Sequence, residues 1–170
     1  AADYLKNNNS NISLSDFSTI MTELGIGKNM ANSLRHWAES STLFIRGKEA
    51  HSFSKLGETL FALDPYLEIS DSNWLLHYLI VTNHRKNALW FYLFNVFNEQ
   101  IIIKDEFLIS AANWFQGLGV KLNLKTLERD FQCCMNMYDS SKINDKKSTE
   151  SMFLSPFREL KLLAKVGEVY

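Results

Sequence analysis

The sequence contains very few cysteines. Its two cysteines, Cys133 and Cys134, are adjacent and lie in a segment of helical periodicity. Side chains of adjacent helical residues point about 100° apart, so this pair indicates neither a disulfide framework nor a metal site. We interpret both as structural cysteines of a protein that works in the reducing cytoplasm.

The sequence also lacks an excess of charge of one sign and a long hydrophobic run. Its formal net charge of -1 excludes a polybasic protein that holds nucleic acid through bulk electrostatics, so any such site must be a local patch. The most apolar region, 74–97, is interrupted at 82–87 and does not supply the roughly 20 continuous apolar residues of a membrane span. We therefore expect no membrane partner. No signal peptide is recognisable, and the start at Ala1 instead of methionine indicates a piece of a longer protein.

The sequence does contain a large apolar fraction. Hydrophobic residues make up 46% of the chain and clustered aromatic residues 13%, enough for a substantial core. We predict a mainly α-helical protein with two winged-helix-like units, each a helix-turn-helix plus a small β hairpin, packed on a central aromatic-rich helical hairpin. The predicted boundaries are a loose segment at 1–12, a first unit at 13–66, the helical hairpin at 67–99 and a second unit at 100–170, within one compact module.

The first unit is organised around a glycine turn and an amphipathic helix, residues 24–37. Met30, Leu34 and Trp37 recur at helical spacing and are predicted to face the core. The opposite side carries residue types that contact phosphates and base edges, as a DNA recognition helix requires. Its residues are Lys28, Asn32 and Arg35. A polar helix face that only meets water is the alternative.

A β hairpin is predicted directly after this helix. Residues 43–45 and 51–53 have the composition of short strands and flank a polar turn. The hairpin would form the wing of a winged helix. At its tip it would present the two basic side chains of Arg46 and Lys48 to DNA.

Three helices are predicted between the two units or at their borders. Residues 55–61 form a short helix pattern. The segments 74–81 and 88–97 are apolar nearly all round, which is typical of helices buried on most sides. Asp71 or Ser72 is predicted to cap the first of these two apolar helices. Together they form the predicted central hairpin.

The second unit is predicted to repeat the first in outline. Its first helix has an inward stripe and ends at two glycines, Gly117 and Gly119. That stripe is Phe107, Leu108, Ala111, Trp114 and Phe115. The following helix combines an apolar face with a second basic ridge. The apolar face is Leu124, Leu127, Phe131, Cys134 and Tyr138, and the ridge is Lys121, Lys125 and Arg129. Wing strands are predicted at 152–154 and 162–166.

Other constellations carry weaker chemical signals. Residues 25–28 are Gly-Ile-Gly-Lys, as in part of a phosphate loop, but Asn29 stands where Ser or Thr would hold magnesium, and no strand precedes it. The four histidines lack the paired spacing of metal ligands. His77 lies in an apolar helix and is predicted to be a core histidine. We assign no catalytic residue, no metal ligand and no tightly bound cofactor.

Blocks along most of the chain resemble an uncharacterised bacterial domain family found beside DNA phosphorothioation genes. The matching blocks, in the family's order, are 25–37, 56–57, 64–68, 74–78, 90–95 and 129–130. The resemblance implies a role in phosphorothioation-based defence, in which sulfur replaces a non-bridging phosphate oxygen of DNA. The domain is similar to one carried by a DNA nickase of such a system. None of the matching blocks is a catalytic motif.

From the residues and the resemblance together we expect a DNA-binding component of such a system. Its partners would be DNA, contacted through the two ridges and the wing, and other phosphorothioation proteins. If the full-length protein is a nickase, it would use a divalent metal ion. Two alternatives stay open: a winged-helix protein-interaction scaffold, and a transcriptional regulator without catalytic activity.

Overall fold

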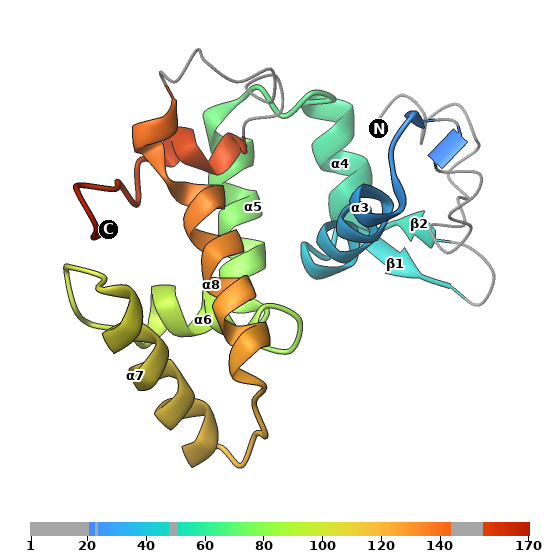
Figure 1. The fold of residues 1–170 in the computed structure, drawn as a ribbon. Coiled ribbons are helices and arrows are strands. Elements are labelled where there is room, and N and C mark those ends of the chain that lie inside the picture. The colour runs from blue at the N-terminus through green and yellow to red at the C-terminus, as the bar shows by residue number, and fades with distance from the viewer. Residues whose placement is uncertain (1–20, 23, 48–50, 144–154) are drawn as a thin grey trace. The chain divides into compact units, whose positions relative to one another are not determined.

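Helices dominate the parts of the chain that the structure, a computed structural model, describes: residues 21–22, 24–47, 51–143 and 155–170 (Figure 1). The helices are α3 (Lys28–Ser40), α4 (Lys55–Leu63), α5 (Ser70–Thr82), α6 (Ala88–Asn95), α7 (Lys104–Gly117) and α8 (Leu124–Tyr138). The strands are β1 (Phe44–Arg46) and β2 (His51–Phe53), and the 3₁₀ turns are η1 (Ser140–Lys142) and η3 (Pro156–Leu160). No helix within these residues is long and apolar enough to cross a membrane.

The contacts within the chain divide it into two units, residues 1–83 and 84–170. The division falls between α5 and α6, inside the segment predicted to form a central helical hairpin. Both apolar segments of that hairpin are helices, as predicted. The boundaries proposed at residues 66 and 99 stay a prediction.

α3 packs in the first unit through small side chains. Ala31 is fully buried and Ala38 is 9% exposed, whereas Met30 is 51% exposed. Leu34 packs against the two alanines. The prediction that Met30 faces the core is therefore wrong. One residue step turns the helix by about 100°, and the alanine side allows a closer approach to the neighbouring strands than a methionine would.

The predicted hairpin after α3 is confirmed. β1 and β2 pair antiparallel, with Phe44 opposite Phe53 and Arg46 opposite His51. The ring centroids of Phe44 and Phe53 lie 4.7 Å apart, and Phe53 lies 5.4 Å from Phe61 of α4. This aromatic cluster joins the two strands to α4.

A single carboxylate sets the start of α5. The side chain of Asp64 accepts hydrogen bonds from the backbone N–H groups of Glu68 and Ile69, each at 3.0 Å. The chain is thereby turned so that the helix begins at Ser70, and the predicted caps Asp71 and Ser72 lie inside its first turn. The assignment of either residue as the cap is wrong.

α5 is less buried than its apolar sequence predicts. Leu76, Ile80 and Val81 are buried, but Trp74 is 45% exposed and Tyr78 is 61% exposed. In α6 of the second unit, by contrast, four of eight residues are buried. The prediction that both helices are covered on most sides therefore holds for α6 and is wrong for the side of α5 that carries Trp74 and Tyr78.

The second unit is built around α8. Phe131 of this helix packs on Phe107 of α7, with ring centroids 5.2 Å apart, and Tyr138 packs on Phe94 at 4.8 Å. η3 lies against the same helix (Figure 1), where Phe157 stacks on Tyr138 at 5.3 Å. The inward stripe predicted for α8 is thus largely confirmed.

In the second unit, most residues of the two predicted inward stripes are buried or half-buried. Along α7, Phe107, Ala111 and Phe115 are buried as predicted, and the helix ends at Gly117. On α8, however, Leu124 is 67% exposed although it was predicted to face inward. It is the first residue of the helix, and the described elements leave most of its side chain uncovered.

The second predicted wing is wrong within the described residues. Residues 156–160 form the η3 turn, and 162–166 contribute only isolated bridges, between Leu163 and Asp139 and between Val166 and Val169. The other predicted strand, 152–154, lies outside the described residues. The reason is a buried acceptor: Asp139 Oδ1 accepts from Lys165 N–H at 3.2 Å, which holds the C-terminal segment against the end of α8.

Candidate nucleic-acid interface

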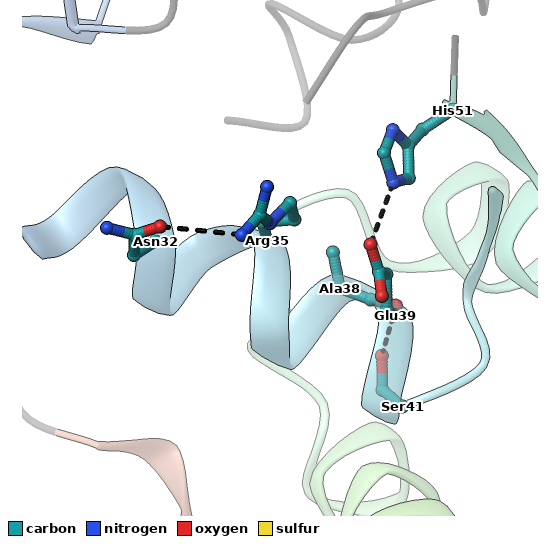
Figure 2. A network of polar contacts seen from close by, with 6 residues as sticks. All are labelled: Asn32, Arg35, Ala38, Glu39, Ser41 and His51. Carbon is teal, nitrogen blue, oxygen red and sulfur yellow. Dashed lines mark hydrogen bonds and ion pairs between the residues drawn. The ribbon is translucent and has the colours of Figure 1, made fainter. Parts of the chain in front are cut away.

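Three side chains predicted to contact DNA lie along one side of α3. Lys28 is exposed in the first turn, and Asn32 and Arg35 are half-buried on the turns that follow. Arg35 Nη2 donates to Asn32 Oδ1 at 3.5 Å, a long hydrogen bond between the two (Figure 2). An asparagine that reads adenine uses both ends of its amide, so base contact by Asn32 would involve the same Oδ1 that accepts from Arg35.

A buried histidine holds the hairpin against the far end of α3. His51 is 2% exposed, and its Nε2 lies 3.0 Å from Glu39 Oε1 (Figure 2). The other ring nitrogen is buried without a hydrogen-bond partner, so the contact with Glu39 orients the imidazole. Sequence reasoning missed this pair, because the two residues are 12 positions apart and belong to different elements.

The hairpin positions one more of the predicted residues. Arg46 ends β1, is exposed, and lies opposite His51 in the strand register. The contact between His51 and Glu39 therefore ties the base of the wing to the helix that carries the first ridge. Lys48, predicted for the wing tip, lies outside the described residues.

The second predicted ridge is shorter than expected. Lys125 and Arg129 are exposed and one turn apart on α8. Lys121 precedes the helix, because Asn123 Oδ1 accepts the N–H of Lys125 at 3.0 Å and caps a helix that begins at Leu124. The prediction that Lys121 shares a helix face with the other two cations is wrong.

An acidic residue accompanies this second ridge. Glu128, which lies between the two cations in the sequence, pairs with Lys104 of α7. The hydrogen bond and the charge attraction raise the pKa of Lys104 and lower the pKa of Glu128. The surface around Lys125 and Arg129 is therefore of mixed charge. The polar side of α3 at Lys28, by contrast, has no acid in its first turn.

The remaining reactive side chains have structural surroundings. Burial raises the pKa of the Cys133 and Cys134 thiols, and burial lowers the pKa of His77. At neutral pH the thiols are protonated and the imidazole is uncharged. Cys134 is buried, as predicted for a structural cysteine, whereas Cys133 is exposed and His77 is only half-buried, so the core position predicted for His77 is not confirmed. Within the described residues, no three His, Cys, Asp or Glu side chains gather as metal ligands.

The whole chain is similar to one protein family. The family described as "Protein of unknown function (DUF4007)" matches residues 1–170, and a search of curated proteins found no match. A solved structure described as "Magnesium ion-bound SspB crystal structure" has a TM-score of 0.67 and 20% sequence identity, and the match covers 87% of this chain and 47% of that one. The chain thus spans about half the length of the protein it matches. At this identity the similarity is one of fold.

Proposed function

The chain belongs to the DUF4007 family along its whole length, and on this premise we propose that it is a DNA-binding component of a bacterial phosphorothioation-based defence system. Two observations support the connection to such a system. Its sequence blocks resemble a domain family found beside phosphorothioation genes, and its fold is similar to that of SspB.

One structural observation carries the DNA-binding part of the proposal. The side of α3 with Lys28, Asn32 and Arg35 and the β1 residue Arg46 belong to the same unit, and the contact of His51 with Glu39 links helix and hairpin. A helix with phosphate-binding and base-reading side chains beside a basic hairpin is the arrangement of a winged-helix DNA reader. The helix would enter a groove and Arg46 would contact the backbone.

Lys125 and Arg129 of α8 are a secondary part of the same proposal. They belong to the other unit, and Glu128 beside them weakens the local positive field. We therefore assign the larger share of DNA affinity to α3 and the hairpin. Lys121, which precedes α8, and Lys48 would add phosphate contacts.

DNA nicking is the more specific form of this proposal. The structure similar in fold is described as magnesium-bound, and it is about twice as long as this chain. We propose that the full-length protein nicks DNA with a divalent metal ion, and that residues 1–170 supply the DNA-binding scaffold for that reaction.

The DNA-binding proposal is tested by removing the two cations of the α3 ridge. Lys28→Ala combined with Arg35→Ala should weaken binding to a short DNA duplex about tenfold or more. It should also reduce the slope of log affinity against log salt by about two, since each phosphate contact contributes about 0.9 to that slope. Fluorescence anisotropy at several salt concentrations measures both quantities.

A matched double variant controls for the loss of charge. Lys55→Ala with Arg85→Ala removes the same charge from exposed positions outside both ridges and should leave the salt slope within error of the wild type. Equal effects of the two double variants would contradict a site on α3. A footprint confined to one promoter would instead select a transcriptional regulator.

A protein-interaction scaffold is the second candidate function. It is supported by the near-neutral net charge of -1 and by the large exposed apolar side chains of the second unit, among them Ile109 and Leu124. Retention of partner proteins by a chain that retains no DNA would favour this candidate over the first.

A further inference from the structure

A row of three exposed polar side chains runs along α3 on the side opposite the core. Ala31 is fully buried and Ala38 is 9% exposed, so these two residues mark the side of the helix that packs on its unit. Helix residues follow one another at about 100°, and the positions opposite the two alanines all carry exposed side chains. This outer row of α3 consists of Asn29, Ser33 and His36.

The cations of the α3 ridge lie beside the outer row. Lys28 and Arg35 each precede a residue of the row by one position, so they project about 100° to one side of it. Asn32 lies on the same flank, is half-buried, and accepts from Arg35 through its Oδ1. A helix inside a DNA groove turns its outermost side toward the base edges and its flanks toward the phosphates of the groove walls. In that position the outer row meets the bases, and the two cations meet the backbone.

The residue types of the outer row are unusual for an exposed helix side. Asparagine, serine and histidine all favour a helix less than alanine, lysine, glutamate or glutamine, and exposure means that packing does not require them here. All three types can donate hydrogen bonds, and the base edges of the major groove carry acceptors. The ring of His36 also lies edge-on to Trp37, with centroids 4.8 Å apart, which restricts its orientation. Residues chosen against helix preference and for hydrogen bonding are typical of a functional site.

We propose that the outer row of α3 reads base edges in the major groove of double-stranded DNA, with the amide of Asn29 paired to N6 and N7 of an adenine. This inference rests on the proposed DNA binding by α3 and assigns its sequence preference to residues outside the basic ridge. From Asn29 to His36 the helix rises about 10 Å, at about 1.5 Å per residue. That length equals roughly three base pairs at about 3.4 Å each, so the preferred sequence is short.

The test selects DNA from a pool of short duplexes with a randomised centre and sequences what the chain retains. The wild type should enrich a motif of roughly three base pairs that contains an adenine. Asn29→Ala should lose the preference for this adenine, and the ratio of affinities for the selected and an unselected duplex should fall about tenfold. Ser33→Ala and His36→Ala should relax the neighbouring positions. Fluorescence anisotropy with both duplexes measures the ratios.

Asn113→Ala is the matched control, since it replaces an exposed asparagine within α7 of the other unit and should leave the ratio unchanged. Alanine favours a helix more than asparagine does, so neither substitution should unfold the protein. Lys28→Ala with Arg35→Ala should instead weaken both duplexes by a similar factor, because phosphates are the same in every sequence.

Three outcomes would overturn the inference. The wild type could enrich no sequence, the preference could survive all three substitutions in the outer row, or it could be lost in Asn32→Ala and retained in Asn29→Ala. The last result would place base reading on the flank of the helix. The proposed function fails by a different result, in which Lys28→Ala with Arg35→Ala leaves the binding of every duplex unchanged.

Discussion

Single polar residues buried in this protein join segments that are distant in sequence. His51 links the hairpin to α3 through Glu39, and the fully buried Asp139 holds the C-terminal segment through the N–H of Lys165. Asp64, 4% exposed, acts over a shorter distance by accepting hydrogen bonds from the backbone that follows it. A buried acceptor of this kind stabilises the fold only while its partners are in place, because the unpaired group would carry the cost of desolvation.

Asp64 supports a prediction about pH. Burial acts to raise the pKa of its carboxyl, but hydrogen bonds from the Ser72 side chain and from the following backbone N–H groups outweigh burial and lower the pKa below its ordinary value of 3.8. The folded state therefore binds this proton less tightly than the unfolded state. Its contribution to stability is complete above about pH 4 and is lost as the pH falls through the lower, folded pKa.

Asp64→Asn removes this titration. The variant should be less stable than the wild type at neutral pH, and its stability should fall less steeply as the pH is lowered below 4. Urea denaturation at a series of pH values measures both effects. A wild-type slope in Asp64→Asn would contradict the role assigned to this carboxylate.

At the scale of elements, the close approach of Gly57 to the backbone of Leu43 decides how α4 packs on the hairpin. Ser54 caps α4 by accepting the N–H of Gly57 at 3.0 Å. Gly57 is buried, and a Cβ added to it would lie 2.3 Å from the carbonyl oxygen of Leu43 and 3.3 Å from Cδ1 of Phe53. The helix lies this close to the strand region only because the position has no side chain.

Gly57→Ala should therefore destabilise the protein by about 2 kcal/mol, because the backbone oxygen of Leu43 cannot move aside without shifting the strand. Thermal or urea denaturation measures the change. Gly117→Ala is the matched control, since its added Cβ meets nothing within 4 Å and alanine favours a helix by up to about 1 kcal/mol. Equal stability of the two variants would show that α4 can move away from the strand at little cost.

At the scale of the whole molecule, the two units have different surfaces. The first carries the α3 ridge and the hairpin, and the second carries an apolar groove beside a ridge of mixed charge. Under the proposed function, the first unit would contact DNA. The exposed apolar side chains of the second unit would be available to other proteins.

The proposal that residues 1–170 bind DNA and that the full-length protein nicks it predicts the outcome of a plasmid assay. Residues 1–170 should retard supercoiled plasmid without nicking it, whereas the full-length protein should convert it to open circles when magnesium is supplied. Agarose gels with and without a chelator separate the two results. Lys28→Ala with Arg35→Ala in the full-length protein should lower nicking and binding together. Nicking by residues 1–170 alone would place the chemistry within this chain.

Predictions were correct where the structure depends on interactions between residues close in the sequence. The hairpin, the helices α4 and α7 and most of the α8 stripe were predicted correctly, because composition and periodicity are local properties. The prediction of a second wing was wrong. Residues 162–166 have the sequence pattern of a strand, but Leu163 forms an isolated bridge with Asp139 at the end of α8. Of the candidate site, Lys28 and Arg35 share a side of α3 and Lys125 and Arg129 lie one turn apart on α8, whereas Lys121 precedes the helix that the Asn123 cap starts. Contact of these residues with DNA stays a prediction.

By itself the sequence determined where most of the helices and the first hairpin lie and which residues share a side of a helix. Only the tertiary structure decided which side is covered: Ala31 and Ala38 are buried where Met30 was expected, and Leu124 is open to water. It also decided that Glu39 meets His51. The physical reason is that periodicity arises from the geometry of one element, whereas burial and polar pairing depend on the shape and chemistry of what packs against it.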